Sequence, residues 1–222
     1  MSKKVYVSPS DQERNMYAVG NTNEKEQCHA ITAALVEALV RCGMQAKTNY
    51  VASMKDRVKE SNEWNADLHL PIHTNAHNGK VMGTRLFSYA STGEGNRACE
   101  AIMETLAPVT PGESDAIAPA NFYEIRCATA PTAYIEVGFH DNKEEAKWMI
   151  ENTEQIAEAI CQGVCEYFGV KYEAPKVEKP VEPEDATLYR VQVGAFRNKQ
   201  LAQALVNRLK AAGFTQAYVK TN

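Results

Sequence analysis

The sequence predicts an α/β protein with an open, twisted, mostly parallel sheet and helices on both faces, followed by a small β-α-β unit. Two observations carry this prediction. Short strand-like segments alternate with longer segments whose apolar residues recur every three or four positions, which is typical of parallel sheets with crossover helices. Residues 172–185 are then rich in Pro, Glu and Lys, which indicates a linker before a second, shorter segment.

The first helix illustrates how each element is predicted. Asn23 is a capping residue placed before the acidic residues of a first turn. Ile31 and Leu35 belong to an apolar stripe on one helix face, and Gly43 supplies the left-handed end. By the same reasoning, strands are expected at residues 5–7, 67–73, 83–89 and 133–139, and helices at residues 54–64, 95–106, 143–151 and 153–168.

The chain is expected to divide into three parts. Residues 1–170 form the main domain, residues 171–187 the linker, and residues 188–222 the C-terminal unit. In that unit, residues 188–196 alternate like a strand, and three leucines spaced four apart mark a helix that ends at Gly213. A second strand is expected to start at Ala217.

Composition excludes several classes of function. The net charge of -4 gives no reason to expect a nucleic-acid partner, whose phosphates require a basic surface. No stretch approaches the ~20 apolar residues of a membrane helix, and the N-terminus lacks the apolar run of a signal peptide. We therefore expect synthesis in the cytoplasm. The six cysteines are expected to be reduced core thiols and not a four-thiolate zinc site.

Three side chains that bind metals or move protons are expected near one edge of the sheet. Glu24 opens the first helix, His73 ends its own strand, and Glu136 lies within a later strand. Ligands of open α/β sheets bind outside the carboxyl ends of the strands, which Glu24 and His73 can both reach. Carboxylate and imidazole groups ligate catalytic zinc, and a further carboxylate serves as general base. His69 points to the same face as His73, either as its neighbour in the site or as a buried structural histidine.

Spacing alone favours ordinary solvated side chains at these positions, but three sequence strings argue for a site. LPIHTNA at residues 70–76 resembles the Ser-Ile/Leu-His-x-Asn-Ala element of the zinc N-acetylmuramoyl-L-alanine amidases of the amidase-3 type. NEKE at residues 23–26 resembles the family's liganding-glutamate element. PTAYIEVGFHDN at residues 131–142 resembles the family element around its catalytic glutamate. The three strings occur in family order within residues 1–170, which makes the resemblance specific.

The resemblance implies a zinc-dependent enzyme that cuts peptidoglycan between N-acetylmuramic acid and the L-alanine of the stem peptide. It makes Glu24 and His73 zinc ligands and Glu136 the catalytic carboxylate. Asn75 and His77, in the loop after His73, are expected to contact the substrate. His140 is expected to be exposed or to face the substrate.

One family feature is missing from the turn after the first strand. The family has a zinc-binding histidine in an Asp-Pro-Gly-His-Gly turn, whereas residues 8–12 read SPSDQ. Asp11 falls nearest to the ligand position and is the expected third ligand, through a carboxylate oxygen. The alternatives are a water held by Gln12 or Asn15, or a substitute ligand from His29.

The C-terminal segment resembles the start of a SPOR domain, a family that binds the glycan strands of peptidoglycan, through the string YRVQVGAF at residues 189–196. The family fold is a duplicated β-α-β unit, and residues 188–222 hold one unit. So short a piece buries little apolar surface, and its strand leaves an unpaired edge. We therefore expect two chains to pair through this unit as a homodimer. The rival expectation is a disordered tail.

Three functions follow from these observations. The first is a wall amidase that acts outside the cytoplasm after phage-type release, as an endolysin does. The second is a metal-deficient relative that only binds peptidoglycan, which the missing histidine favours and the retained Glu136 disfavours. The third is a zinc peptidase that cuts a peptide bond within the stem, which has the same ligand chemistry.

Overall fold

The computed structural model describes residues 2–176, 191–211, 214 and 217–220. The chain divides into two compact units, Met1–Lys176 and Val177–Asn222. We describe each unit by itself. The boundaries predicted at residues 170 and 187 stay predictions. No helix within these described ranges is both long enough and apolar enough to span a membrane.

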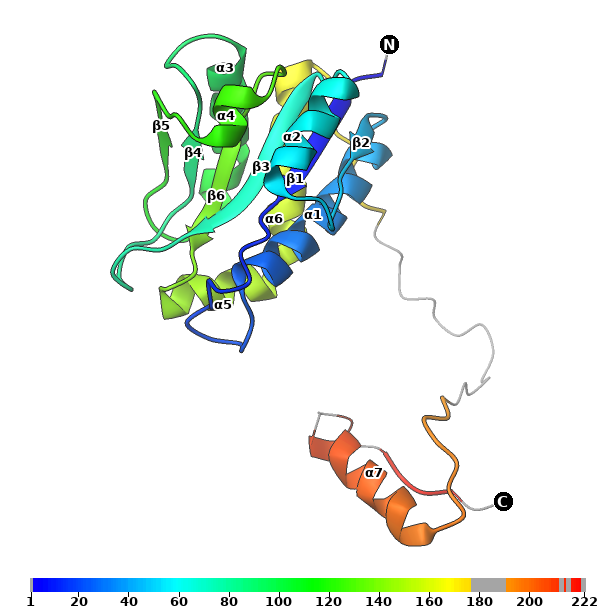
Figure 1. The fold of residues 1–222 in the computed structure, drawn as a ribbon. Helices are drawn as coiled ribbons and strands as arrows, with labels where there is room; N and C mark the ends of the chain where they lie inside the picture. The colour runs from blue at the N-terminus through cyan, green and yellow to red at the C-terminus, as the bar shows by residue number, and fades with distance from the viewer. Residues whose placement is uncertain (1, 177–190, 212–213, 215–216, 221–222) are drawn as a thin grey trace. The chain divides into compact units, whose positions relative to one another are not determined.

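The first unit is built on a six-stranded sheet with the strand order β2-β1-β3-β6-β4-β5 (Figure 1). Neighbouring strands are parallel except β4 and β6, which are antiparallel. The predicted α/β fold with a mostly parallel sheet is confirmed. The strands are β1 (Lys4–Pro9), β2 (Gln45–Lys47), β3 (Leu68–Asn75), β4 (Arg85–Phe87), β5 (Asp115–Ile117) and β6 (Tyr134–Phe139).

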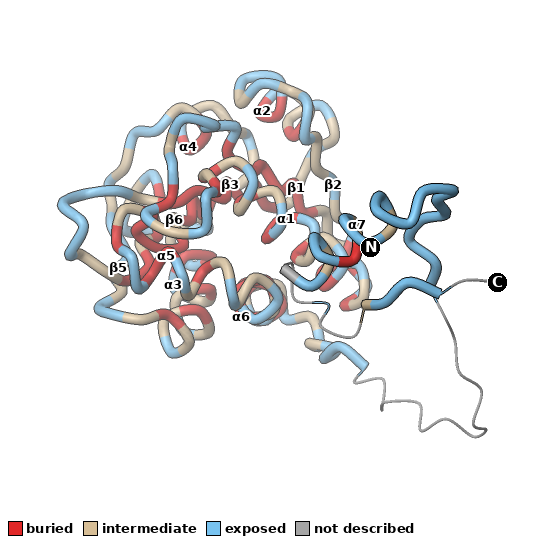
Figure 2. Tube along the Cα trace, turned by 90° about the horizontal axis from the view of Figure 1, so that it is seen from below, coloured by how far each residue is buried: buried red, intermediate tan, exposed pale blue. Residues whose placement is uncertain are grey.

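Helices cover both faces of this sheet, and the two sets are well separated in Figure 2. One face carries α1 (Glu24–Arg41), α3 (Glu94–Leu106), α5 (Lys143–Glu151) and α6 (Thr153–Phe168). The other face carries α2 (Met54–Glu63) and the short α4 (Tyr123–Cys127), and a single 3-10 turn (Ala107–Val109) follows α3. As predicted, Asn23 caps α1 by accepting a hydrogen bond from the Glu26 amide at 3.0 Å, and Gly43 follows the helix at a φ of 79°.

Alternation along β3 separates the core from the polar face of the sheet. Leu68, Leu70 and Ile72 belong to the apolar core against the α1 and α6 side. His69 and His73 point to the opposite face, where α2 and α4 lie. Because side chains alternate along a strand, one sequence supplies both surfaces. The two histidines therefore lie on the polar face of β3, a strand that is buried along nearly all of its length.

The second unit contains α7 (Lys199–Ala211), which begins where the Asn198 side chain accepts a hydrogen bond from the Gln200 amide at 2.8 Å. The predicted helix is thus present, while its predicted end at Gly213 lies outside the described residues. Residues 191–196 and 217–220 adopt no strand, so the expected strands are wrong over these ranges. A strand needs a partner for its amide and carbonyl groups, and none of the described residues of this unit supplies one.

Candidate active site

The residues predicted to form the site meet at the carboxyl end of the sheet. The ends of β1, β3 and β6 and the start of α1 lie at the same end of the first unit (Figure 1). Residues of β3 and β6 are in parallel register, with His73 opposite Glu136. Since residues opposite each other in parallel strands face the same way, this register places both side chains on the polar face.

Glu24 and His73 are in direct contact. The Glu24 carboxylate Oε1 lies 3.0 Å from His73 Nδ1, and its Oε2 accepts a hydrogen bond from the Asn15 amide at 2.7 Å. Glu24 is fully buried although it carries a charge. The side chain is held by α1, while the histidine is held by β3, so the contact joins segments that are far apart in the sequence.

Glu124 of α4, which the sequence did not point to, lies on the other side of His73. Its Oε2 is 3.4 Å from His73 Nε2, and its Oε1 is 3.3 Å from His69 Nε2 and 2.5 Å from the Ser8 hydroxyl. Burial raises the pKa of Glu124, but the hydrogen bonds from His69 and His73 outweigh it and lower the pKa to about 2. Glu124 is therefore a buried carboxylate that stays ionised.

Two carboxylates thus bracket one imidazole ring. Burial lowers the pKa of His73, yet the hydrogen bonds to Glu124 and Glu24 outweigh it and raise the pKa to about 9. The ring of Tyr134 stacks on the imidazole, with centroids 4.7 Å apart and planes 15° apart. The orientation of His73 is therefore fixed on three sides. His69 is the buried structural histidine of the two alternatives, since Ser61 and Glu124 contact its two ring nitrogens.

Glu136 has a carboxylate oxygen with no partner. Its Oε2 is buried and makes no hydrogen bond. Burial raises the pKa of Glu136 to about 7, with the nearby Glu24 raising it further and His73 opposing this. A buried carboxylate with a free oxygen and a pKa near neutrality has the properties that a general base requires.

Asp11, the expected third ligand, contacts a different residue. Its carboxylate lies 3.6 Å from the guanidinium of the buried Arg57, and the side chain is about half exposed at 49%. Gln12 instead reaches the pair, with its Nε2 atom 3.3 Å from Glu24 Oε1 and 3.5 Å from His73 Nδ1. Across the described ranges, no third His, Cys, Asp or Glu completes a close group of metal donors with Glu24 and His73.

The remaining predicted residues lie at or just after the carboxyl ends of β3 and β6. The Asn75 carbonyl accepts a hydrogen bond from the His140 amide at 2.8 Å, and the Asn75 side chain caps the amide of Ala76. His77 is exposed, and its backbone amide donates to Asp141 at 3.0 Å. His140 is buried against Tyr17 and contacts the Thr74 hydroxyl at 3.0 Å, so the expectation that it is exposed is wrong, and the alternative that it faces the substrate stays a prediction.

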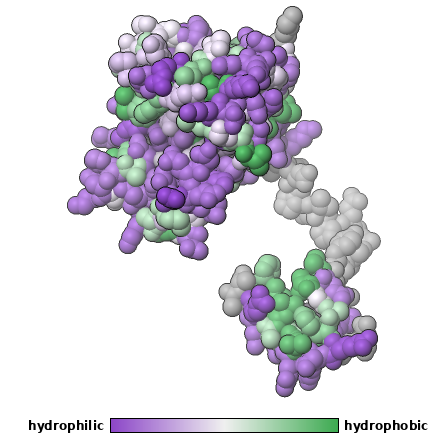
Figure 3. All heavy atoms as spheres, viewed as in Figure 1, coloured by the Kyte–Doolittle hydropathy of each residue, from purple (hydrophilic) through white to green (hydrophobic). Residues whose placement is uncertain are grey.

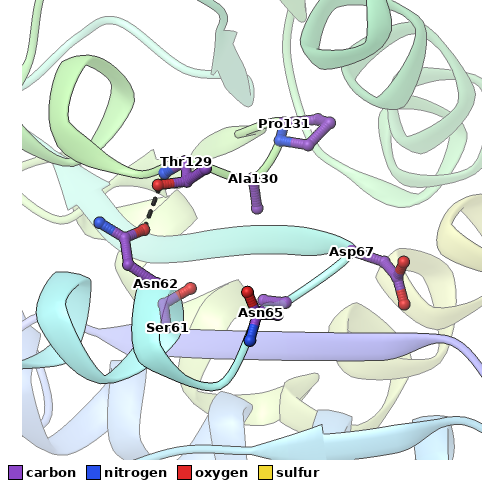
Figure 4. Close-up of a pocket in the computed structure, with 8 residues that line it drawn as sticks. Ser61, Asn62, Asn65, Asp67, Thr129, Ala130 and Pro131 are labelled. Atoms are coloured by element: carbon purple, nitrogen blue, oxygen red, sulfur yellow. Dashed lines mark hydrogen bonds between the residues drawn. The ribbon is translucent and has the colours of Figure 1, made fainter.

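A separate cavity of about 260 Å³ lies at the opposite, amino end of β3 (Figure 4). Asn62 and Thr129 close one side of it through a 2.7 Å hydrogen bond. Asp67, the only ionisable residue that lines it, is engaged by the backbone amide of Lys4 at 2.7 Å. No His, Cys, Glu, Lys or Arg lines this cavity.

Comparison with known proteins decides the family. The sequence model of the N-acetylmuramoyl-L-alanine amidase family matches residues 7–166. The chain belongs to this amidase family. Membership confirms the predicted peptidoglycan amidase function. A second match, to the SPOR domain, covers residues 171–222 of the amidase.

Individual relatives agree with this assignment. The amidase is 26% identical to N-acetylmuramoyl-L-alanine amidase CwlM of Bacillus licheniformis, over 95% of this chain and 82% of the relative. It is 25% identical to the sporulation-specific N-acetylmuramoyl-L-alanine amidase of Bacillus subtilis, with the same coverage of both chains.

Solved structures show the same fold. The catalytic domain of CwlV from Bacillus (Paenibacillus) polymyxa superposes with a TM-score of 0.68 at 20% identity, over 76% of this chain and 99% of that one. An N-acetylmuramoyl-L-alanine amidase from Clostridium difficile 630 superposes with a TM-score of 0.66 at 22% identity, over 76% and 97%.

Proposed function

We propose that this amidase hydrolyses the bond between N-acetylmuramic acid and L-alanine with a zinc ion bound by Glu24 and His73, and with Glu136 as the general base. The observation that carries the proposal is the pair of contacts made by one imidazole. Its Nδ1 faces Glu24 at 3.0 Å, and its Nε2 faces Glu124 at 3.4 Å. Histidines that ligate zinc usually donate their other ring N–H to a carboxylate, which fixes the tautomer.

The donor set fits zinc. A carboxylate and an imidazole that lie in contact are ordinary zinc ligands, and the unpartnered oxygen of Glu136 faces no protein donor. Glu124 holds the Nε2 proton of His73, so the Nδ1 atom would give up the proton that now faces Glu24 and would bind the metal through its lone pair. In this role Glu124 is a positioning residue.

We propose Gln12 as the third zinc ligand, in place of Asp11. Its side-chain amide already lies within 3.5 Å of both Glu24 and His73. Its carbonyl oxygen and amide nitrogen are exchanged by a half-turn of the amide group, and the oxygen is the atom that a metal would bind. Asp11 can take this role only if it leaves Arg57, whose buried charge would then lose a partner.

When bound, zinc lowers the pKa of a water to about 7 and polarises the carbonyl of the scissile amide. Glu136 accepts a proton from the attacking water and delivers it to the departing nitrogen. The amide C–N bond breaks, the lactyl group of the muramic acid becomes a carboxylic acid, and L-alanine gains a free amine. The Oε2 atom of Glu136, which would carry this proton, is buried.

We also infer that the amidase acts on the wall outside the cytoplasm and that the SPOR-like unit binds glycan strands. The match at residues 171–222 supports this second role. A tethered binding unit raises the local concentration of the catalytic unit at its substrate.

The reaction is tested by digestion of purified peptidoglycan. We expect new free amino groups on L-alanine and no new reducing sugar ends. New reducing ends would indicate a glycosidase, which uses a pair of carboxylates and no metal. Free amines on residues other than L-alanine would indicate the zinc peptidase. No released products from a zinc-loaded chain would indicate the wall-binding relative without activity.

The metal is tested by zinc content. His73→Ala is expected to lose one equivalent of zinc relative to the wild type, whereas His29→Ala, a half-buried histidine of α1 that packs against Tyr50, should lose none. Gln12→Ala is expected to bind zinc more weakly than Asp11→Ala. If Asp11→Ala instead binds zinc more weakly than Gln12→Ala, Asp11 is the third ligand.

A further inference from the structure

Three buried cysteines form a close group at the end of α1 that is distant from the active site. Cys42 caps α1, and Cys161 and Cys165 lie four residues apart on one face of α6. Because α1 packs against α6, the three sulfur atoms lie within 4.8 Å of one another. Within the described ranges, this is the only group of three His, Cys, Asp or Glu side chains whose donor atoms have the spacing of metal ligands.

The active site and this group lie at opposite ends of the same helix. Glu24 is the first residue of α1, and Cys42 follows its last residue. An α-helix rises ~1.5 Å per residue, which separates the two ends by ~27 Å over these 18 residues. The cysteine group therefore cannot share a ligand with the catalytic residues.

The spacing of the sulfur atoms matches thiolates bound to one metal. Cys42 Sγ lies 3.7 Å from Cys161 Sγ. Zinc–sulfur bonds of ~2.3 Å at tetrahedral angles place two thiolates about 3.8 Å apart. A disulfide would need the same two sulfur atoms to approach to about 2.05 Å, and the cysteines of the described residues are all free thiols.

The surroundings also favour a cation. The C-terminal end of a helix carries a partial negative charge, and Cys42 lies at that end of α1. Burial raises the pKa of the Cys42 thiol, whose Sγ also lies 3.8 Å from the Glu173 carbonyl, whereas the Glu173 backbone amide, which donates to Sγ at 3.3 Å, favours the thiolate. The Arg41 guanidinium does not occupy the space among the three sulfur atoms, since it is bound by Glu158 and by the Glu173 carbonyl.

We propose that Cys42, Cys161 and Cys165 bind one thiophilic divalent cation, of the zinc class, as three thiolates. Three thiols release three protons to solvent as three metal–sulfur bonds form. The site lies beneath residues 172–173, whose contacts with Glu158 and Arg41 hold the end of the first unit in place. The bound cation would stabilise the packing of α1 against α6 next to residues 172–173, where the chain leaves the catalytic unit.

Cadmium is the probe for this site, because cadmium–thiolate bonds give an ultraviolet charge-transfer absorption that carboxylate and imidazole ligands do not give. The reduced full-length amidase is titrated with Cd(II). We expect one equivalent to produce the absorption. Cys161→Ser and Cys42→Ser should lower the affinity for that equivalent ~100-fold or more, since even outer partners of metal ligands contribute 10–100-fold.

Cys99→Ser and Cys28→Ser are the matched controls, because both residues are buried single thiols outside the group. Both variants should keep the absorption. Cys42 is the least buried of the three ligands, so its serine variant is the one best suited to stay folded, and circular dichroism checks this. A wild-type chain without the absorption overturns the proposal. The same holds if folded Cys42→Ser binds Cd(II) as tightly as wild type, or if Cys28→Ser alone loses the absorption.

Discussion

The two units of the amidase differ most in where they hold their apolar side chains. In the first unit, Leu35, Leu70 and Ile135 are completely buried. In the second, Val191 is 89% exposed and Leu201 is 57% exposed. Figure 3 shows apolar side chains gathered on the visible surface of the second unit. Since burial of apolar surface is the main favourable term in folding, only the first unit has a core that is complete within the described residues.

This difference in burial corresponds to the two roles proposed for the units, which are catalysis in the first unit and glycan binding in the second. The catalytic residues need fixed positions, and the first unit provides them through buried strands and hydrogen-bonded carboxylates. A unit that binds long glycan strands needs area more than precision. It can leave apolar surface open until a partner covers it. The following predictions test whether the division of labour between the two units is this complete.

The largest effect is expected from Glu136→Gln, which removes the proposed general base and is expected to leave the sheet intact. We expect wall clearing to slow by ~10²–10⁴-fold, the usual contribution of general-base catalysis, while sedimentation with insoluble walls stays unchanged. Glu144→Gln, an exposed glutamate on α5, is the control. Clearing at the wild-type rate would contradict the assignment of Glu136.

Truncation of one leucine in each unit compares their cores directly. Leu70→Ala leaves a cavity in a fully buried strand and should lower the free energy of unfolding by ~2–5 kcal/mol. Leu201→Ala, on the exposed side of α7, should change the stability of the first unit by less than about 0.5 kcal/mol. Urea denaturation monitored by tryptophan fluorescence measures both. Equal losses would mean that the two units fold as one.

Glu124→Gln tests the positioning of His73. The amide cannot provide the same charged acceptor to both histidines, so we expect zinc affinity and activity to fall ~10–100-fold without loss of fold. Glu124→Asp should recover part of the loss. Glu113→Gln, an exposed glutamate, is the matched control. An unchanged zinc affinity would mean that Glu124 serves the structure alone.

The smallest effect on activity is expected from the open surface of the second unit. Pairing of two chains would cover Val193 and Phe196, which are 61% and 47% exposed. We expect light scattering to report a dimer for the full chain and a monomer for a chain that ends at Lys176. Val193→Ser with Phe196→Ser should shift the full chain to monomer. Two monomers in the first comparison would remove the pairing hypothesis.

The sequence predicted the long elements well because their ends carry local chemistry. Asn23 and Asn142 cap their helices, and the helices predicted at residues 143–151 and 153–168 have the bounds found. The strands β2 and β5 were not predicted, since three residues are too few to show an alternating pattern. Their position is set by pairing with neighbouring strands.

Within the site, the sequence identified the residues that belong to family strings and missed the one that does not. Glu24, His73 and Glu136 are found together as predicted. Glu124 lies on a five-residue helix with no periodic pattern, and it reaches His73 only because α4 folds across β3. The direction of Asp11 depends on Arg57, which is more than forty residues away in the sequence. Contacts of this kind are not readable from spacing.

The alternation of β3 has a consequence for how this gene can vary. Substitutions at Leu70 or Ile72 alter the volume of the core and leave the histidines where they are. Insertion or deletion of a single codon within Leu68–Ile72 would reverse the faces of the strand residues that follow it, His73 included. His73 would then point into the core, and Ile72 (after an insertion) or Thr74 (after a deletion) would take its place beside Glu24. The number of residues in this strand is therefore more constrained than the identity of most of them. Deletion of any single residue from Leu68 to Ile72 should yield no active variant.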